Sequence, residues 1–158
     1  MYKKIMVPLD GSQLAECVLP HLEMITRACQ MATVVLVRVA DPGLPPETFP
    51  TSAEFGLYRT DWEKLMKHRQ TEAEDYLKKL CSRLNYDWAN VESKVLVGTV
   101  SETLADYATK NDVDLILIAS HGRSGISRWV MGSVADRVMR SACVPVLIIR
   151  APGCVAGI

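Results

Sequence analysis

Five short runs of mainly aliphatic residues, separated by stretches with helical spacing, constrain the fold of this chain most. The runs occupy residues 3–9, 33–39, 91–98, 113–120 and 144–150. Short runs of this kind, with helices between them, are typical of strands in a parallel sheet that is covered on both faces. We therefore predict a three-layer α/β fold around a five-stranded parallel sheet.

The stretches between these runs predict four helices. They occupy residues 12–30, 62–84, 99–112 and 133–142. Pro20 interrupts the first and is expected to kink it. Thr99 and Glu102 have the spacing of a capping box, which indicates a helix start. Residues 41–60 hold four prolines and two glycines and predict a long irregular connection, either a binding loop or a surface insertion.

Length and charge limit the function classes. A chain of 158 residues suits one domain, and we assign it to residues 1–150, with a C-terminal tail over 151–158. Eighteen basic residues balance eighteen acidic ones, which argues against duplex DNA or an anionic membrane as a partner. No run is long enough to span a bilayer, and the N-terminus is a poor signal peptide. We expect a cytoplasmic protein.

The cysteines indicate neither a zinc site nor a disulfide framework, because their number is odd and no CxxC pair occurs. They are Cys17, Cys29, Cys81, Cys143 and Cys154. We expect most of them to be small core residues in a reducing compartment, and Cys154 to be an exposed thiol of the tail.

Polar, glycine-containing stretches follow the first and the fourth predicted strand. They are residues 8–12, PLDGS, and residues 119–122, ASHG. In an open parallel sheet, ligands bind at the carboxyl ends of the strands where the strand order reverses. If the order is 3-2-1-4-5, the reversal falls between the first and fourth strands. The two stretches then face each other across one crevice.

The segment ASHGRSGISRWVMGS, residues 119–133, suits phosphate oxygens. Glycines let backbone amides approach a ligand, and the helix that follows offers unpaired N–H groups at its start. Ser133 lies three residues before Asp136, as in a helix cap. The candidate phosphate contacts are Gly122, Arg123, Gly125, Ser127, Arg128, Gly132 and Ser133. Each alone is explained as a turn residue, a cap or a solvated charge. Their joint position favours a phosphate site.

Asp10 suits the other half of a nucleotide. A carboxylate accepts hydrogen bonds from a ribose hydroxyl or an adenine amino group, although an aspartate before a helix is also common in turns. Val39 ends the second strand, where its backbone amide and carbonyl could flank a base.

These residues resemble the nucleotide-binding branch of the universal stress protein family, nearly end to end, from KKIMVPLDGS to VPVLIIR. The signature of that branch is Gly, two residues, Gly, nine residues, Gly, and Ser or Thr. Gly122, Gly132 and Ser133 keep this spacing, while Ala119 replaces the first glycine. Alanine adds little bulk, but it puts the closest backbone approach to the ligand in question.

The resemblance implies an adenine nucleotide alpha hydrolase-like, Rossmann-like fold with strand order 3-2-1-4-5. It implies ATP or AMP in the crevice, with Mg²⁺ or Mn²⁺ accompanying the triphosphate. The adenosine half would be held by Pro8, Asp10 and Val39, and the phosphates by Gly122, Gly132, Ser133 and Val134. It also implies a homodimer, or a higher oligomer, through strand 144–149, whose apolar edge otherwise invites aggregation.

We expect a regulatory, ATP-binding stress protein without a dedicated reaction, because GxxxxGK[ST] and an acidic cluster for magnesium are missing. His121 could serve as the base of a slow ATPase, but we favour a structural hydrogen bond for it. A purely structural dimerisation module is the main alternative. A phosphoryl-receiver domain lacks its clustered carboxylates here, and a dinucleotide oxidoreductase lacks its GxGxxG. We expect Gly132→Val to abolish binding and leave the fold intact.

Overall fold

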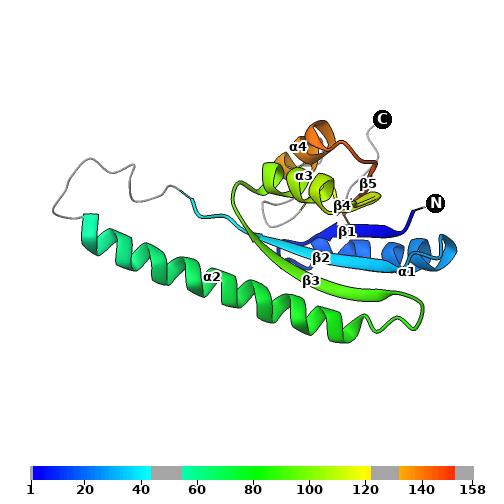
Figure 1. Cartoon of the computed structure of the whole chain (residues 1–158), viewed down its shortest axis with the longest axis horizontal. Coiled ribbons are helices and arrows are strands. Elements are labelled where there is room, and N and C mark those ends of the chain that lie inside the picture. Colours follow the sequence, from blue (N-terminus) through cyan, green and yellow to red (C-terminus); the bar gives the residue numbers. More distant parts are fainter. Residues whose placement is uncertain (1, 44–54, 122–131, 152–158) are drawn as a thin grey trace.

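The five strands form one parallel sheet in the order β3-β2-β1-β4-β5. The computed structural model describes residues 2–43, 55–121 and 132–151 (Figure 1). The strands are β1 (Lys4–Pro8), β2 (Thr33–Ala40), β3 (Asn90–Val97), β4 (Leu115–Ala119) and β5 (Val146–Ile149). The predicted five-stranded parallel sheet and its order 3-2-1-4-5 are confirmed.

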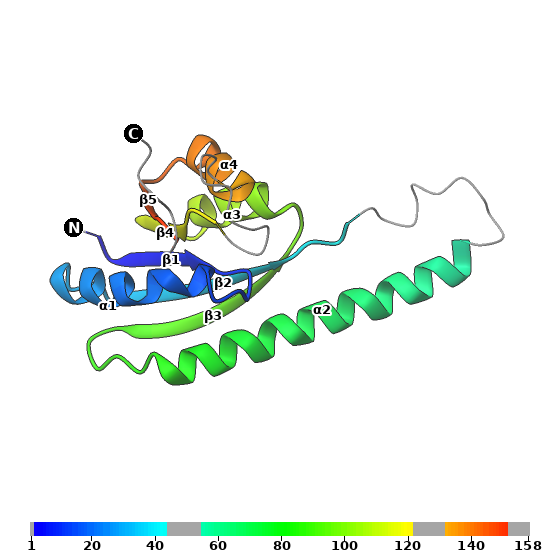
Figure 2. The ribbon, with the colours of Figure 1, turned by 180° about the vertical axis from the view of Figure 1, so that it is seen from behind.

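Helices cover both faces of the sheet, as Figures 1 and 2 show. They are the short 3-10 turn η1 (Ala15–Val18), α1 (Leu19–Ala28), α2 (Phe55–Arg83), α3 (Val100–Lys110) and α4 (Ser133–Ser141). One core cluster joins the sheet to α1 and α2, and a second joins it to α3 and α4. Among the described helices, none is both long and apolar enough to cross a bilayer.

The alternation of side chains along β1 explains how one strand serves both cores. Ile5 and Val7 lie in the cluster beneath α1 and α2, while Met6 lies in the opposite cluster, and all three are fully buried. The edge strand β3 differs from this pattern. Glu92 and Lys94 are exposed, so β3 is not covered on both faces, which corrects our prediction for that strand.

Two helix predictions are wrong in detail. Pro20 does not kink a helix, because it lies in the first turn of α1, where a missing N–H costs nothing. The preceding residues form the separate turn η1. The irregular connection predicted for 41–60 is shorter, since α2 begins at Phe55. Residues 44–54 lie outside the described part of the chain.

The long helix α2 extends past the carboxyl ends of the strands (Figure 1). Its buried residues recur at helical spacing and include Met66, Ala73, Leu77 and Leu80. Two hydrogen bonds tie it to the segment after β2. The indole N–H of Trp62 donates to the Pro42 carbonyl (3.1 Å), and Nη1 of Arg69 donates to the Asp41 carbonyl (2.7 Å). The helix thereby becomes a wall beside this edge of the sheet.

The cysteines are less buried than we expected. Cys17, Cys29 and Cys81 are half-buried at the margin of one core cluster, and Cys143 is exposed. All four are free thiols. Burial raises the pKa of the Cys17 and Cys81 thiols, which disfavours the reactive thiolate. Cys154 lies outside the described residues.

Asp114 ties the start of β1 to β4. Its Oδ2 accepts hydrogen bonds from the backbone N–H groups of Lys3 (2.7 Å) and Lys4 (2.8 Å). These two bonds stabilise the carboxylate and lower the pKa of Asp114 below its usual value.

We expect the contribution of Asp114 to stability to depend on pH. A carboxyl group with a lowered pKa in the folded state stabilises the protein above the unfolded value of about 4, and the effect disappears as the pH falls through the folded pKa. Asp114→Asn should therefore lower the urea midpoint at pH 7 and have less effect at pH 3. Parallel pH profiles for the two proteins would contradict this.

Candidate functional site

A pocket of about 540 Å³ lies at the carboxyl edge of the sheet. The ends of β1, β2 and β4 form its floor, and α2, α3 and the start of α4 form its walls. Seven of the ten predicted site residues line it. They are Pro8, Asp10, Val39, Ala119, Gly132, Ser133 and Val134. The acidic bend after β1 and the start of α4, more than a hundred residues apart, thus meet at one cavity.

The other three predicted site residues fall outside the described part of the chain. They are Gly122, Arg123 and Gly125, and the same holds for the accessory candidates Ser127 and Arg128. Their contacts with a ligand stay predictions.

Asp10 shapes a tight turn as well as lining the pocket. Its Oδ1 accepts the backbone N–H of Ser12 (2.9 Å), and Gly11 between them has a φ of 88°, a conformation that favours glycine. The Ser12 hydroxyl in turn accepts the N–H of Ala15 (3.1 Å), where η1 begins. The turn and the pocket therefore depend on the same short segment.

The start of α4 differs from the predicted cap. Gly132 is the N-cap and Ser133 is already the first helical residue, with no side-chain cap bond. Asp136 instead pairs with Arg140, at 3.0 Å between Oδ2 and Nε. The early N–H groups of a helix have no partner within it, so those at Ser133 and Val134 lie where an anion could accept them. The capping box predicted at Thr99 also lacks its side-chain bond, although α3 does begin at Val100.

Gly132 allows two backbone segments to approach closely. Its N–H donates to the Ser120 carbonyl (2.9 Å), and a Cβ at this position would lie 2.7 Å from that same oxygen. In contrast to the prediction from the sequence, we therefore expect Gly132→Val to disturb the fold, since the side chain would collide with the end of β4.

Ser120 joins three parts of the fold at the base of the pocket. Its N–H donates to the Ile149 carbonyl (2.7 Å), and its buried hydroxyl accepts the N–H of Ala151 (3.1 Å). The same hydroxyl lies 3.0 Å from Nδ1 of His121. This contact agrees with the structural hydrogen-bonding role that we favoured for His121, which also lines the pocket.

The α2 side of the pocket is a polar wall that sequence reasoning missed. Arg38 from β2 and Arg69 and Glu72 from α2 line it, together with Asp41. The signal was present in the sequence, because Arg38 is the one charged residue within the aliphatic run TVVLVRV. The contribution of α2 could not be predicted without its position in the fold.

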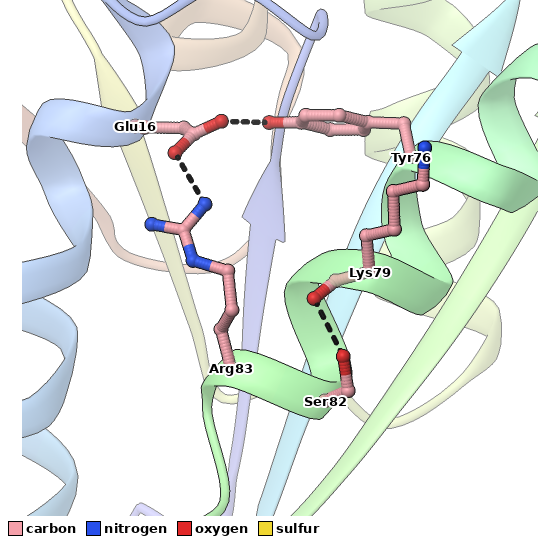
Figure 3. A network of polar contacts seen from close by, with 5 residues as sticks. All are labelled: Glu16, Tyr76, Lys79, Ser82 and Arg83. Carbon is pink, nitrogen blue, oxygen red and sulfur yellow. Dashed lines mark hydrogen bonds and ion pairs between the residues drawn. The ribbon is translucent and has the colours of Figure 1, made fainter.

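A hydrogen-bond network fixes α2 to the segment after the Asp10 turn (Figure 3). Glu16 accepts the Tyr76 hydroxyl (3.2 Å) and pairs with Arg83 (3.4 Å). Burial raises the pKa of the Tyr76 phenol, and the Glu16 carboxylate raises it further, so that Tyr76 remains a neutral donor. This network holds the α2 wall in register with the floor of the pocket.

The described lining has no excess of positive charge. Its charged side chains are Asp10, Asp41 and Glu72 against Arg38 and Arg69. Within the described lining, a phosphate would therefore depend on the amides at the start of α4. No group of three or more His, Cys, Asp or Glu side chains that could hold a metal ion occurs among the described residues.

Comparison with known proteins identifies the family. The model of the universal stress protein family matches residues 1–150. Universal stress protein MJ0531 of Methanocaldococcus jannaschii is 29% identical over 157 residues, covering 96% of this chain and 84% of that protein. Universal stress protein G of Salmonella typhimurium is 29% identical over 154 residues, covering 95% of this chain and all of the relative.

Solved structures have the same fold. The structure of MJ0577 superposes with a TM-score of 0.80 at 25% identity, over 97% of this chain and 99% of that one. A family member from Arabidopsis thaliana with AMP bound has a TM-score of 0.65 at 16% identity, covering 96% and 93%. A universal stress protein in complex with cAMP has a TM-score of 0.56 at 21% identity, covering 95% and 98%. By its sequence over residues 1–150, this chain belongs to the universal stress protein family.

Proposed function

We propose that this protein binds an adenine nucleotide, ATP or AMP, in the pocket at the carboxyl edge of the sheet. The observation that carries the proposal is the convergence of the Asp10 turn and the start of α4 on one cavity of about 540 Å³. That volume lies within the range of pockets for small ligands. The position is also the point at which the strand order reverses, where open α/β sheets bind their ligands.

The ligand would lie across the ends of β2, β1 and β4. Its adenosine half would contact Pro8, Asp10 and Val39, whose carboxylate and backbone groups suit hydroxyl and amino donors. Its phosphates would lie at the amides of α4. The phosphate contacts that we propose are Ala119, Gly122, Arg123, Gly125, Gly132, Ser133 and Val134. The AMP and cAMP complexes of structural neighbours support an adenine ligand.

A divalent cation would be carried by the triphosphate. The described residues form no acidic cluster for it, and Mg²⁺ is commonly held through substrate phosphates with few protein ligands. Within the proposal, Mg²⁺ or Mn²⁺ accompanies ATP and is not needed for AMP.

The proposed role is regulatory, in the response to stress, with the nucleotide as a bound signal and no dedicated reaction. A homodimer through residues 144–149 fits this role. β5 forms one end of the described sheet, and Leu147 on it is 39% exposed. Pairing of this edge with a second copy would cover it.

If slow ATP hydrolysis occurs, His121→Ala tests whether His121 acts as the base. Unchanged turnover in this variant would exclude that role.

The direct test is to denature the purified protein and identify the released small molecules by mass spectrometry. We expect ATP or AMP at near-stoichiometric amounts, and a rise in melting temperature when either is added to the stripped protein. A preparation that releases no nucleotide and shows no thermal shift would contradict the proposal and favour a structural dimerisation module.

A further inference from the structure

Arg38 is a buried charge on the floor of the pocket. It lies in β2 with 8% of its surface exposed, between Val37 and Val39, and it lines the cavity. Placing an arginine in a buried strand costs free energy unless the charge is paired and its donors are satisfied. The contacts of this side chain therefore indicate whether it serves the core or the pocket.

The described residues satisfy only part of the Arg38 guanidinium. Nη2 donates to Oε1 of Glu72 (3.1 Å), and the group lies over the Tyr76 ring, 5.4 Å from its centroid. A guanidinium carries five N–H donors in a rigid fork. Among the described residues, the bond to Glu72 is its only hydrogen bond.

The remaining donors of Arg38 are not fully buried, and the residue lines the cavity. Within the described part of the chain, the Tyr86 hydroxyl is the only solvent-inaccessible side-chain polar atom that lacks a hydrogen-bond partner. The other guanidinium nitrogens are therefore not enclosed in the core. Glu72 and Tyr76 hold the fork in place at the pocket, with donors left over for a ligand.

Arg38 and the start of α4 lie at different ends of the pocket. Arg38 shares a face of the sheet with Leu36, which packs beneath α1 and α2, whereas Ala135 of α4 packs on the opposite face. Strand β1 separates β2 from β4, so the two strands are about 10 Å apart. If the phosphates of a ligand lie at the α4 amides, Arg38 is positioned to contact the opposite end of the same ligand.

We propose that Arg38 is a specificity-determining residue that donates hydrogen bonds to acceptor atoms of the nucleoside half of the ligand, either ring nitrogens of the base or ribose oxygens. The inference rests on the proposed nucleotide function and adds a residue to it. Glu72 and Tyr76 act as positioning residues for the guanidinium.

The test compares Arg38→Met, which keeps the length but no donor, with Arg38→Lys, which keeps the charge but not the fork. The control is Lys78→Gln on α2, because Lys78 is exposed, pairs with Glu74 of the same helix and does not line the pocket. Affinities for adenosine, AMP and ATP are measured by calorimetry, and melting temperatures without ligand check folding. If Arg38→Met does not fold, the lysine variant carries the same comparison.

We expect Arg38→Met to weaken the binding of all three ligands by the same factor. The factor should be about tenfold, because one charge-assisted hydrogen bond is lost. The affinity of Arg38→Lys should be intermediate and that of Lys78→Gln unchanged. In the unmodified protein, 7-deazaadenosine should reproduce the loss if N7 is the acceptor, and 2′-deoxyadenosine should reproduce it if the 2′ oxygen is the acceptor. Unchanged affinities, or a loss that grows with the number of phosphates, would overturn the assignment. If the unmodified protein binds none of the three, the proposed function fails first, and this inference with it.

Discussion

Ser133→Pro is expected to weaken ATP and AMP binding by roughly ten- to a hundredfold and to leave adenosine binding unchanged. Ser133 is the first residue of α4, where proline is well tolerated. The preceding Gly132 has a ψ of 141°, the extended conformation that a residue before proline prefers. The substitution thus removes one amide donor from the proposed phosphate site, worth about 1.5–3 kcal/mol when its acceptor is charged. Calorimetry with the three ligands measures the difference.

Ser133→Ala is the matched control for this experiment. It keeps the backbone N–H and removes only the hydroxyl, so the difference between the two variants isolates the amide. We expect the alanine variant to lose less affinity than the proline variant. Equal losses for adenosine and ATP in the proline variant would mean that α4 does not face the phosphates.

The layers could be predicted because they depend on patterns carried by whole elements, whereas the strand order 3-2-1-4-5 was implied by the family resemblance. A run such as residues 113–120 is hydrophobic on both faces, and helices on both faces of the sheet are the arrangement that buries it. Parallel strands also need crossovers of one hand, which leaves few possible orders. The exposure of β3 follows from that order too, since it is an edge strand with Glu92 and Lys94 on its surface.

The helix ends could not be predicted, because tertiary contacts decide them. At α4 the Ser120 carbonyl binds the N–H of Gly132, which places the cap one residue earlier than the local pattern indicates. Asp136 then pairs with Arg140 and does not complete a cap. The contact with Ser120 is not visible from the sequence around Ser133, whereas Asp136 and Arg140 do have the i,i+4 spacing of a helical ion pair.

The site was predictable along the strand ends but not along its α2 wall. Asp10 follows β1 and Ser133 follows β4, so the order implied by the family resemblance was enough to bring them together. Arg38 and Glu72 are 34 residues apart, and their meeting depends on where α2 packs. An arginine inside an aliphatic run was the available signal. Its role in the pocket could not be inferred without knowing where α2 packs.

Gly132→Val is expected to destabilise the protein as well as impair nucleotide binding. Any Cβ at this position would lie 2.7 Å from the Ser120 carbonyl oxygen and 3.5 Å from the His121 Cα, so backbone at the end of β4 must move. Such overpacking costs about 1–3 kcal/mol. Chemical denaturation measures this loss, with Ser133→Ala as the neighbouring variant that adds no clash. Unchanged stability would show that the β4 end yields freely, and would restore Gly132→Val as a clean probe of phosphate contact.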